Sequence, residues 1–173
     1  MSVDPVRGDS EEEVEAFRLL FVCTGNTCRS PLAEAAAHAE IRRRGWSQVD
    51  VRSAGVAAAP SGAASAQAVA VAAEAGLDLS GHRATPLSER ELARADLILA
   101  MSPSHLSELE RWGVADKAAL ITEFAQGRDD AGGSGGGVAD PVGGDVAEYR
   151  HTLEELQGLV KRALDRLEPG LAP

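Results

Sequence analysis

A cysteine, an arginine and a serine stand close together in this chain, at a spacing that suits chemistry on a phosphoryl group. The segment reads Cys23-Thr-Gly-Asn-Thr-Cys-Arg29-Ser30-Pro31. A loop of this kind can curl its backbone N–H groups into a nest that binds an anion. Arg29 adds a planar fork that can bind two phosphoryl oxygens at once. The segment therefore predicts an oxyanion cradle with a thiol nucleophile beneath it.

The residues inside this loop have separate expected roles. Gly25 is expected to take a backbone conformation closed to other residues, and Asn26 to tolerate a left-handed one. The Ser30 hydroxyl is expected to donate a hydrogen bond to the Cys23 thiolate, which the positive end of a helix also favours. Pro31 suits the first turn of that helix. These features predict covalent catalysis through a phosphocysteine intermediate, with an ordinary buried cysteine as the alternative.

The loop resembles the signature C-x5-R-S-P of the low-molecular-weight protein phosphatases. Four further stretches resemble family landmarks in the family's order: Ser53-Ala54-Gly55, Gly81-His82-Arg83-Ala84, Ala95 to Met101, and Asp140-Pro141. The resemblance implies Cys23 as nucleophile, Arg29 as phosphate clamp and Asp140 as general acid. It implies that the other loop residues hold the phosphoryl group or the loop itself: Thr24, Gly25, Asn26, Thr27, Cys28 and Ser30. No metal and no cofactor is implied.

Local residues bear on which phosphorylated side chain the site takes. The chain resembles arginine phosphatases in having Thr27 at this position, where tyrosine-specific members usually carry an aliphatic residue. The alternative is that the exchange of one β-branched residue for another has no effect on specificity. Asp140-Pro141 is followed by Val142-Gly143-Gly144, which offers no aromatic wall to stack on a phenyl ring. The stretch from Val56 to Pro60 offers none either. Arginine phosphatases often have an aromatic residue near that stretch, so the chain departs from both groups.

These features favour a cysteine-dependent protein arginine phosphatase. A protein tyrosine phosphatase that uses the same residues is the alternative, and a non-catalytic phosphate-binding module or an arsenate reductase fits less well. Thioredoxin-linked arsenate reductases need further relay cysteines, and this chain has only Cys28 besides Cys23. A reversible disulfide between these two would protect Cys23 from overoxidation, as the resemblance suggests; a small loop-filling Cys28 is the other interpretation.

Length and composition narrow the class of protein. At 173 residues the chain predicts one domain, and its net charge of −10 argues against a nucleic-acid binder. Residues 1–16 hold six acids and one base, which predicts a flexible leader. The resemblance implies that 17–173 form a single phosphatase domain. No stretch resembles a signal peptide or a membrane span, and the scarcity of cysteines suits the cytoplasm. Phosphorylated proteins are the expected partners, and the resemblance implies a monomer.

The elements that position the loop alternate between strand and helix. Apolar runs predict buried strands over 17–22, 49–53, 95–101 and 118–121. Helices are predicted over 31–44, 63–75 and 102–112, and from Asp145, where Glu148 completes a capping box. An apolar stripe of the last helix, from Val146 to Leu167, is expected to face the sheet.

This alternation predicts a three-layer α/β domain of Rossmann-like type, and the resemblance implies a four-stranded parallel sheet flanked by helices. The Cys loop then lies beyond the carboxyl end of the first strand, where such sheets bind ligands. The glycine-rich run 127–137 predicts a flexible surface insertion. The four histidines (His38, His82, His105 and His151) lack metal-ligand spacing, which predicts surface or packing roles.

Overall fold

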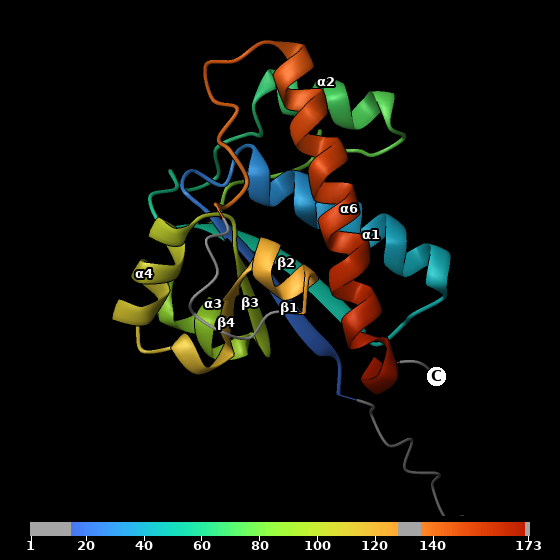
Figure 1. The fold of residues 1–173 in the computed structure, drawn as a ribbon. Coiled ribbons are helices and arrows are strands. Elements are labelled where there is room, and N and C mark those ends of the chain that lie inside the picture. Colours follow the sequence, from blue (N-terminus) through green and yellow to red (C-terminus); the bar gives the residue numbers. More distant parts are fainter. Residues whose placement is uncertain (1–14, 128–135, 172–173) are drawn as a thin grey trace, which may run out of the picture.

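The fold, a computed structural model, is described for residues 15–127 and 136–171. Over these residues the chain forms a parallel four-stranded sheet of order β2-β1-β3-β4, with helices on both faces (Figure 1). The strands are β1 (Phe17–Cys23), β2 (Val49–Gly55), β3 (Leu97–Ala100) and β4 (Ala118–Leu120). The predicted fold class is confirmed. The predicted leader lies outside the described residues except for Glu15 and Ala16, and so does most of the glycine-rich run.

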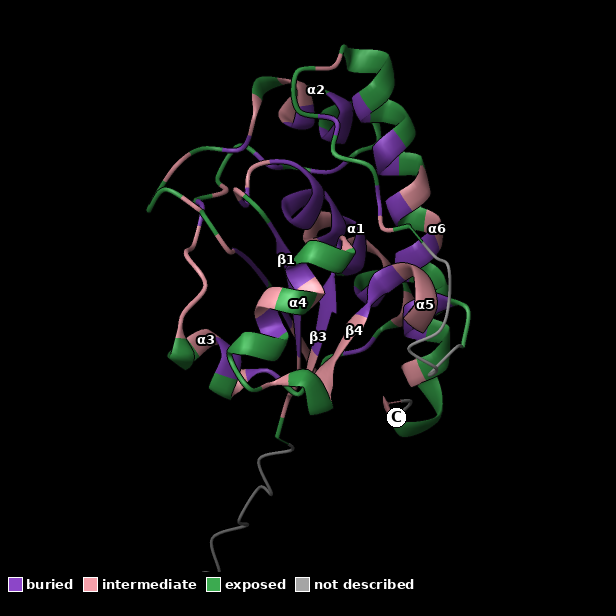
Figure 2. Ribbon diagram, turned by 60° about the vertical axis from the view of Figure 1, so that its left-hand side comes forward, coloured by how far each residue is buried: buried purple, intermediate pink, exposed green. Residues whose placement is uncertain are grey.

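The helices alternate with the strands along the chain. They are α1 (Arg29–Arg44), α2 (Ala66–Glu74), α3 (Glu89–Arg94), α4 (Pro103–Arg111), α5 (Ile121–Ala125) and α6 (Val146–Leu171), with a short 3₁₀ turn, η1 (Ala115–Lys117). Successive strand residues point to opposite faces of a sheet, which gives the molecule two cores. Leu19 and Phe21 join the core under α1, α2, α5 and α6, whereas Leu20 and Val22 join the core under α3 and α4. Figure 2 shows buried residues along the strands and on the inner sides of the helices.

The central position of β1 places the Cys loop. The strand pairs with β2 from Phe17↔Val49 to Cys23↔Gly55, and its other edge pairs with β3. The carboxyl end of β1 therefore opens between two neighbouring strands, and α1 begins only a short loop later. This is the predicted location of the phosphate cradle.

Several element boundaries differ from the predicted ones. α3, α5 and η1 were not predicted, because each is too short for a periodic pattern. α2 starts later than expected, where the Ser65 hydroxyl accepts a hydrogen bond from the Ala68 N–H. β4 ends at Leu120, and Ile121 already belongs to α5. Half of the predicted capping box of α6 is present, since Asp145 Oδ1 accepts from the Glu148 N–H at 2.9 Å.

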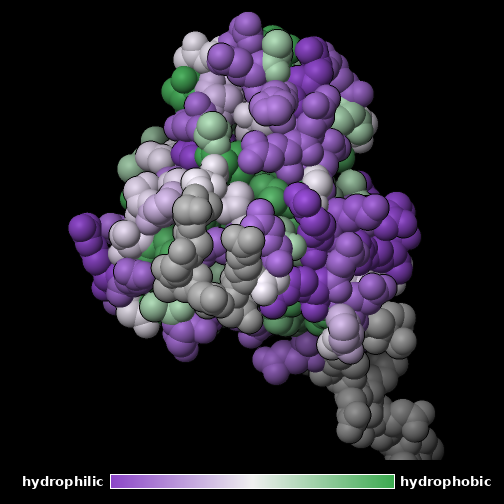
Figure 3. Space-filling model, in the orientation of Figure 1, coloured by the Kyte–Doolittle hydropathy of each residue, from purple (hydrophilic) through white to green (hydrophobic). Residues whose placement is uncertain are grey.

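The apolar stripe of α6 packs mainly against α1, α2 and α5. Tyr149, Leu153, Leu156, Val160 and Ala163 are buried there, within the same core that contains Phe21 of the sheet. Val146 is 38% exposed, so the stripe does not include its first predicted member. The face of the molecule seen in Figure 3 is mostly hydrophilic. None of the helices within the described ranges has the length and apolar character that crossing a membrane requires.

Candidate active site

The loop between β1 and α1 is built around Asn26 rather than Gly25. Asn26 takes the left-handed conformation, with φ of 54°, as predicted. Gly25 does not have a positive φ, and an added Cβ would meet only ordinary contacts. The prediction that Gly25 takes a backbone conformation closed to other residues is therefore wrong. The left-handed position falls on the residue whose amide also ties the loop together, since Asn26 Oδ1 accepts from the Thr85 N–H at 2.9 Å.

A chain of side-chain hydrogen bonds ends at the cysteine. Because Asn26 Oδ1 is an acceptor, its Nδ2 group donates, to Ser30 Oγ at 2.8 Å and to Ser53 Oγ at 2.9 Å. Ser30 Oγ thus accepts from the amide and keeps its own proton free. Cys23 Sγ lies 2.8 Å from this hydroxyl, and both groups are buried. The arrangement suits a thiolate that accepts a hydrogen bond from Ser30.

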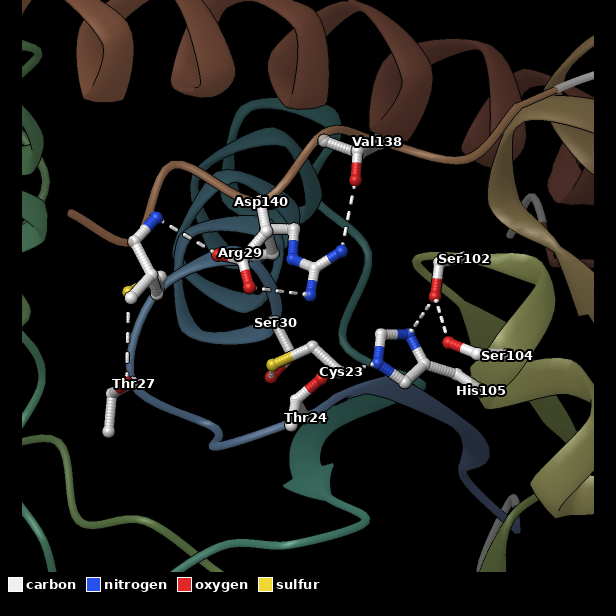
Figure 4. Close-up of polar contacts among 12 residues, drawn as sticks. Cys23, Thr24, Thr27, Arg29, Ser30, Ser102, Ser104, His105, Val138 and Asp140 are labelled. Carbon is white, nitrogen blue, oxygen red and sulfur yellow. Dashed lines mark hydrogen bonds and ion pairs between the residues drawn. The ribbon is translucent and has the colours of Figure 1, made fainter. Parts of the chain in front are cut away.

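Arg29 is the first residue of α1 and is 5% exposed. One terminal nitrogen donates to Val138 O at 3.0 Å, and the other lies 3.3 Å from Asp140 Oδ2 (Figure 4). Asp140 Oδ1 accepts from the Val142 N–H at 3.0 Å, which fixes the carboxylate at the end of its loop. Two residues from distant parts of the chain are brought face to face. Among the described residues, Arg29 is the cation that pairs with Asp140.

These groups surround a cavity of about 220 Å³. Its lining consists of Cys23, Thr24, Gly25, Thr27, Cys28, Arg29, Asp140 and Val142. Seven of these eight residues were predicted to belong to the site. The two predicted residues that do not line it, Asn26 and Ser30, are fully buried and support the loop from below. Val142 is 66% exposed at the edge of the cavity.

Two histidines support the loop, although the sequence suggested only surface or packing roles. His82 lies 2.7 Å from the Asn26 carbonyl oxygen, to which its Nε2–H donates. His105 Nε2 lies 2.8 Å from Thr24 Oγ1 (Figure 4). Burial lowers the pKa of His105 to about 4, and the nearby Arg29 cation acts in the same direction. Neither the His82–Asn26 contact nor the His105–Thr24 contact could be predicted from spacing in the sequence, because the partners come from separate segments of the chain.

Glu34 is a second residue that sequence reasoning missed. It projects from α1 and accepts a hydrogen bond from Ser53 Oγ at 3.1 Å. Burial raises the pKa of Glu34 to about 7, while the Ser53 hydrogen bond and the Arg52 charge oppose this shift. Its Oε2 also lies 3.8 Å from His82 Nδ1. A titratable carboxyl group therefore ends the hydrogen-bond chain that starts at Cys23.

Cys28 lies at the start of α1 and contacts two other helices. Its Sγ is 3.4 Å from the Tyr149 hydroxyl of α6 and 3.5 Å from Ser65 Oγ at the start of α2. Burial raises the pKa of Tyr149. Cys23 and Cys28 are both free thiols. The disulfide between them stays a prediction.

Comparisons with known proteins show the family to which the chain belongs. Residues 18–170 match the family model of the low molecular weight phosphotyrosine protein phosphatases. The chain is 40% identical to a protein-arginine-phosphatase of Bacillus subtilis over 154 residues, which cover 87% of this chain and 96% of the relative.

Two solved structures are similar over most of the chain. A cysteine-to-serine mutant of the YwlE arginine phosphatase, with its active-site serine phosphorylated, gives a TM-score of 0.81 at 38% identity, covering 88% of this chain and 96% of that one. A low molecular weight protein tyrosine phosphatase from T. tengcongensis gives 0.79 at 42% identity, covering 88% and 100%.

Proposed function

Because the chain belongs to the low molecular weight phosphotyrosine protein phosphatase family, we propose that it hydrolyses phosphorylated arginine in proteins, with Cys23 as the nucleophile. One observation carries this proposal: the buried Cys23 thiol, hydrogen-bonded to Ser30, lines the same cavity as the Arg29–Asp140 pair. A thiol, a phosphate clamp and a proton donor are the groups that metal-free phosphoryl transfer requires.

The first step forms the phosphocysteine. The Cys23 thiolate attacks phosphorus, and the bond from phosphorus to the guanidine nitrogen breaks. Asp140 donates a proton to that leaving nitrogen, so the arginine side chain departs as its stable guanidinium cation. Arg29 and the backbone N–H groups of the loop stabilise the charge on the transferring oxygens. The Ser30 hydrogen bond lowers the energy of the thiolate before attack.

The second step releases phosphate. Asp140, now a carboxylate, accepts a proton from a water molecule that attacks phosphorus. The bond between phosphorus and sulfur breaks, and Cys23 leaves as a thiolate again stabilised by Ser30. Asp140 pairs with Arg29 through Oδ2 and lines the same cavity as Cys23, which supports its role in both proton transfers.

The walls of the cavity support arginine as the phosphorylated residue. None of the eight described residues that line it is aromatic, so a phenyl ring finds no stacking partner there. Thr27 offers a hydroxyl and a methyl, and Val142 offers an exposed apolar edge for the methylene groups of an arginine side chain. The B. subtilis relative named for this activity supports the same substrate.

Phosphotyrosine is the second candidate substrate, with the same catalytic residues. The T. tengcongensis structure, named a tyrosine phosphatase, favours it at 42% identity. We place the chain in a reducing cytoplasm as a monomer, because its proposed mechanism needs Cys23 as a free thiolate and the family resemblance implies no partner subunit.

A paired turnover assay tests the substrate. Wild-type protein is given a phosphoarginine-bearing protein and a phosphotyrosine peptide under reducing conditions, with Cys23→Ala as the inactive variant and the exposed His38→Asn as the control. We expect a higher kcat/KM for phosphoarginine and no turnover by Cys23→Ala, which has no nucleophile at this position. A higher kcat/KM for phosphotyrosine makes the second candidate correct, and turnover by Cys23→Ala rules out the covalent mechanism.

A further inference from the structure

A buried histidine from α4 reaches the residue next to the nucleophile. His105 is 2% exposed and lies in the first turn of α4. Its Nε2 is 2.8 Å from Thr24 Oγ1, and its Nδ1 is 2.8 Å from Ser102 Oγ. Figure 4 shows the ring between these two hydroxyls, beside Cys23 and below Arg29. Both ring nitrogens thus have a partner, and the ring plane is fixed.

Ser102 is turned toward this ring instead of capping its helix. It is the N-cap residue of α4, where a serine oxygen ordinarily accepts a hydrogen bond from a backbone N–H of the first turn. No such side-chain bond is present in α4; the hydroxyl lies 2.8 Å from His105 Nδ1 and 2.9 Å from Ser104 Oγ. The Ser102 hydroxyl therefore contacts His105 instead of capping the helix.

Thr24 is the residue that this pair holds. It lines the cavity, and its carbonyl oxygen accepts from the Ala57 N–H at 2.9 Å. On the same side the loop packs so closely on Gly55 that an added Cβ there would stand 2.5 Å from the Thr24 oxygen. The backbone of Thr24 is therefore fixed from the β2 side, and its side chain is fixed from the α4 side. A nest binds an anion only when its N–H groups point inward together.

The charge state of the ring decides which way the hydrogen bonds run. Burial and Arg29 lower the pKa of His105 to about 4, while Asp140 acts in the opposite direction, so the imidazole is neutral at pH 7. A neutral ring donates from one nitrogen and accepts at the other. When Nε2–H donates to Thr24 Oγ1, the hydroxyl proton of Thr24 is free to bind a phosphoryl oxygen in the cavity. Ser102 then donates to Nδ1.

We propose that His105 is a positioning residue of the phosphate loop: it fixes the side chain of Thr24 so that its hydroxyl and backbone N–H face the phosphoryl group. This rests on the proposed function of the loop as a phosphate cradle. His105 does not touch substrate and acts through Thr24.

Two conservative variants separate the two bonds of the ring. The amide of His105→Gln reaches about as far as Nε2 and keeps the contact with Thr24. The shorter His105→Asn reaches only the place of Nδ1 and keeps the contact with Ser102. Thr24→Val removes the hydroxyl from the other end, and the double variant Thr24→Val/His105→Asn completes a cycle. The exposed His38→Asn is the matched control. The Kd of inorganic phosphate, from ³¹P NMR titration, and the KM and kcat for p-nitrophenyl phosphate are measured for each.

We expect His105→Asn to weaken phosphate binding and raise KM by about 3- to 10-fold, the loss that one hydrogen bond carries. His105→Gln and His38→Asn should bind as wild type does. In the Thr24→Val background, His105→Asn should cause no further loss. A loss that persists in full in that background, or an equal loss in His105→Gln, overturns the proposal.

Phosphate binding keeps this test apart from the proposed function. If wild type binds phosphate without turning over any phosphoprotein, the proposed activity fails while the cycle still decides the role of His105. If His105→Asn does not fold, Thr24→Ser and Thr24→Val carry the test, because the first keeps the hydroxyl and the second does not. Equal phosphate affinity in those two variants contradicts the proposal.

Discussion

Asp140 is held at both of its oxygens, which makes its role testable by a single atom change. Oδ1 accepts from the Val142 N–H and Oδ2 pairs with Arg29. Asp140→Asn retains an acceptor for the Val142 N–H but cannot transfer a proton to the leaving nitrogen. We expect kcat for the phosphoprotein to fall about 10²- to 10⁴-fold, with inorganic phosphate still bound. Steady-state kinetics measure this.

The same variant has an internal control in the leaving group. In p-nitrophenyl phosphate the leaving group is a nitrophenolate, which departs readily without a proton. The rate of phosphocysteine formation from this substrate should therefore fall less in Asp140→Asn than the rate from phosphoarginine. Equal kcat for wild type and Asp140→Asn on the phosphoprotein would show that another group acts as the acid.

Glu34 makes stability depend on pH. Burial raises its pKa to about 7 from the ordinary 4.5, so between these values the folded protein binds more protons than the unfolded chain. The stabilising effect of the neutral form is complete below pH 4.5 and is lost as the pH rises through 7. We expect Glu34→Gln to gain roughly 2–3 kcal/mol relative to wild type between pH 4.5 and 8. Urea unfolding at several pH values measures the gain, with exposed Glu154→Gln as control. A pH-independent difference would contradict the assignment.

The residues of the site were predictable where they share one segment. Cys23, Asn26, Arg29 and Ser30 fall within a single loop and helix start, and their spacing alone indicates a phosphate cradle. His105, His82 and Glu34 could not be found in this way. His105 contacts Thr24 and His82 contacts Asn26 of the loop, whereas Glu34 contacts Ser53 of β2. Only the folded sheet brings these separate segments together.

At the scale of elements, the segment that carries Asp140 is fastened to the turn before α4. The Val138 N–H donates to Met101 O at 2.7 Å, and Val138 O accepts from Arg29. An added Cβ at Gly137 would overlap the Met101 carbonyl group and Ser102 Cα, both backbone atoms that cannot swing away. Only a glycine permits this close approach.

Gly137→Ala should therefore displace Asp140 and also the Val138 carbonyl that accepts from Arg29. We expect kcat to fall about tenfold or more, because small misplacements of catalytic groups are costly, and phosphate affinity to fall as well, because Arg29 loses its support. Gly136→Ala is the matched control, since open space surrounds that position. Kinetics and phosphate titration together check this prediction; wild-type kcat in Gly137→Ala would mean that the segment tolerates a shift.

Long elements were predictable and short ones were not. β1, α1 and α6 have extended apolar patterns. The predicted ranges of β1 and α1 nearly match the structure, and α6 begins one residue after the predicted Asp145. α3 carried a signal that was not used: Ser88 with Glu91 three residues on, where Ser88 Oγ accepts from the Glu91 N–H at 3.2 Å. α5 carries no comparable signal, because it begins directly where β4 ends.

At the scale of the whole molecule, anion binding should raise the free energy of unfolding and therefore Tm. A ligand that binds only the folded state at ten times its Kd adds about 1.4 kcal/mol, which for a domain of this size raises Tm by roughly 3–6 °C. We expect this shift with inorganic phosphate and not with sodium chloride of equal ionic strength. Arg29→Lys keeps the charge but loses the planar fork, so its shift should be smaller. Calorimetry measures it, and an equal shift in Arg29→Lys would argue against phosphate binding at Arg29.

The packing of α6 on α1 has a consequence for how the protein is made. A ribosome delivers β1, the cysteine loop and α1 first, and about 100 residues separate Arg44 from Val146. At usual rates of synthesis this interval lasts roughly 5–20 s. Throughout this interval the side of α1 that packs on α6 is uncovered, and the proposed nucleophile exists in a nascent chain that lacks the proposed acid. During its own translation the chain therefore exposes apolar surface and, under the proposed mechanism, has no acid with which to complete the reaction.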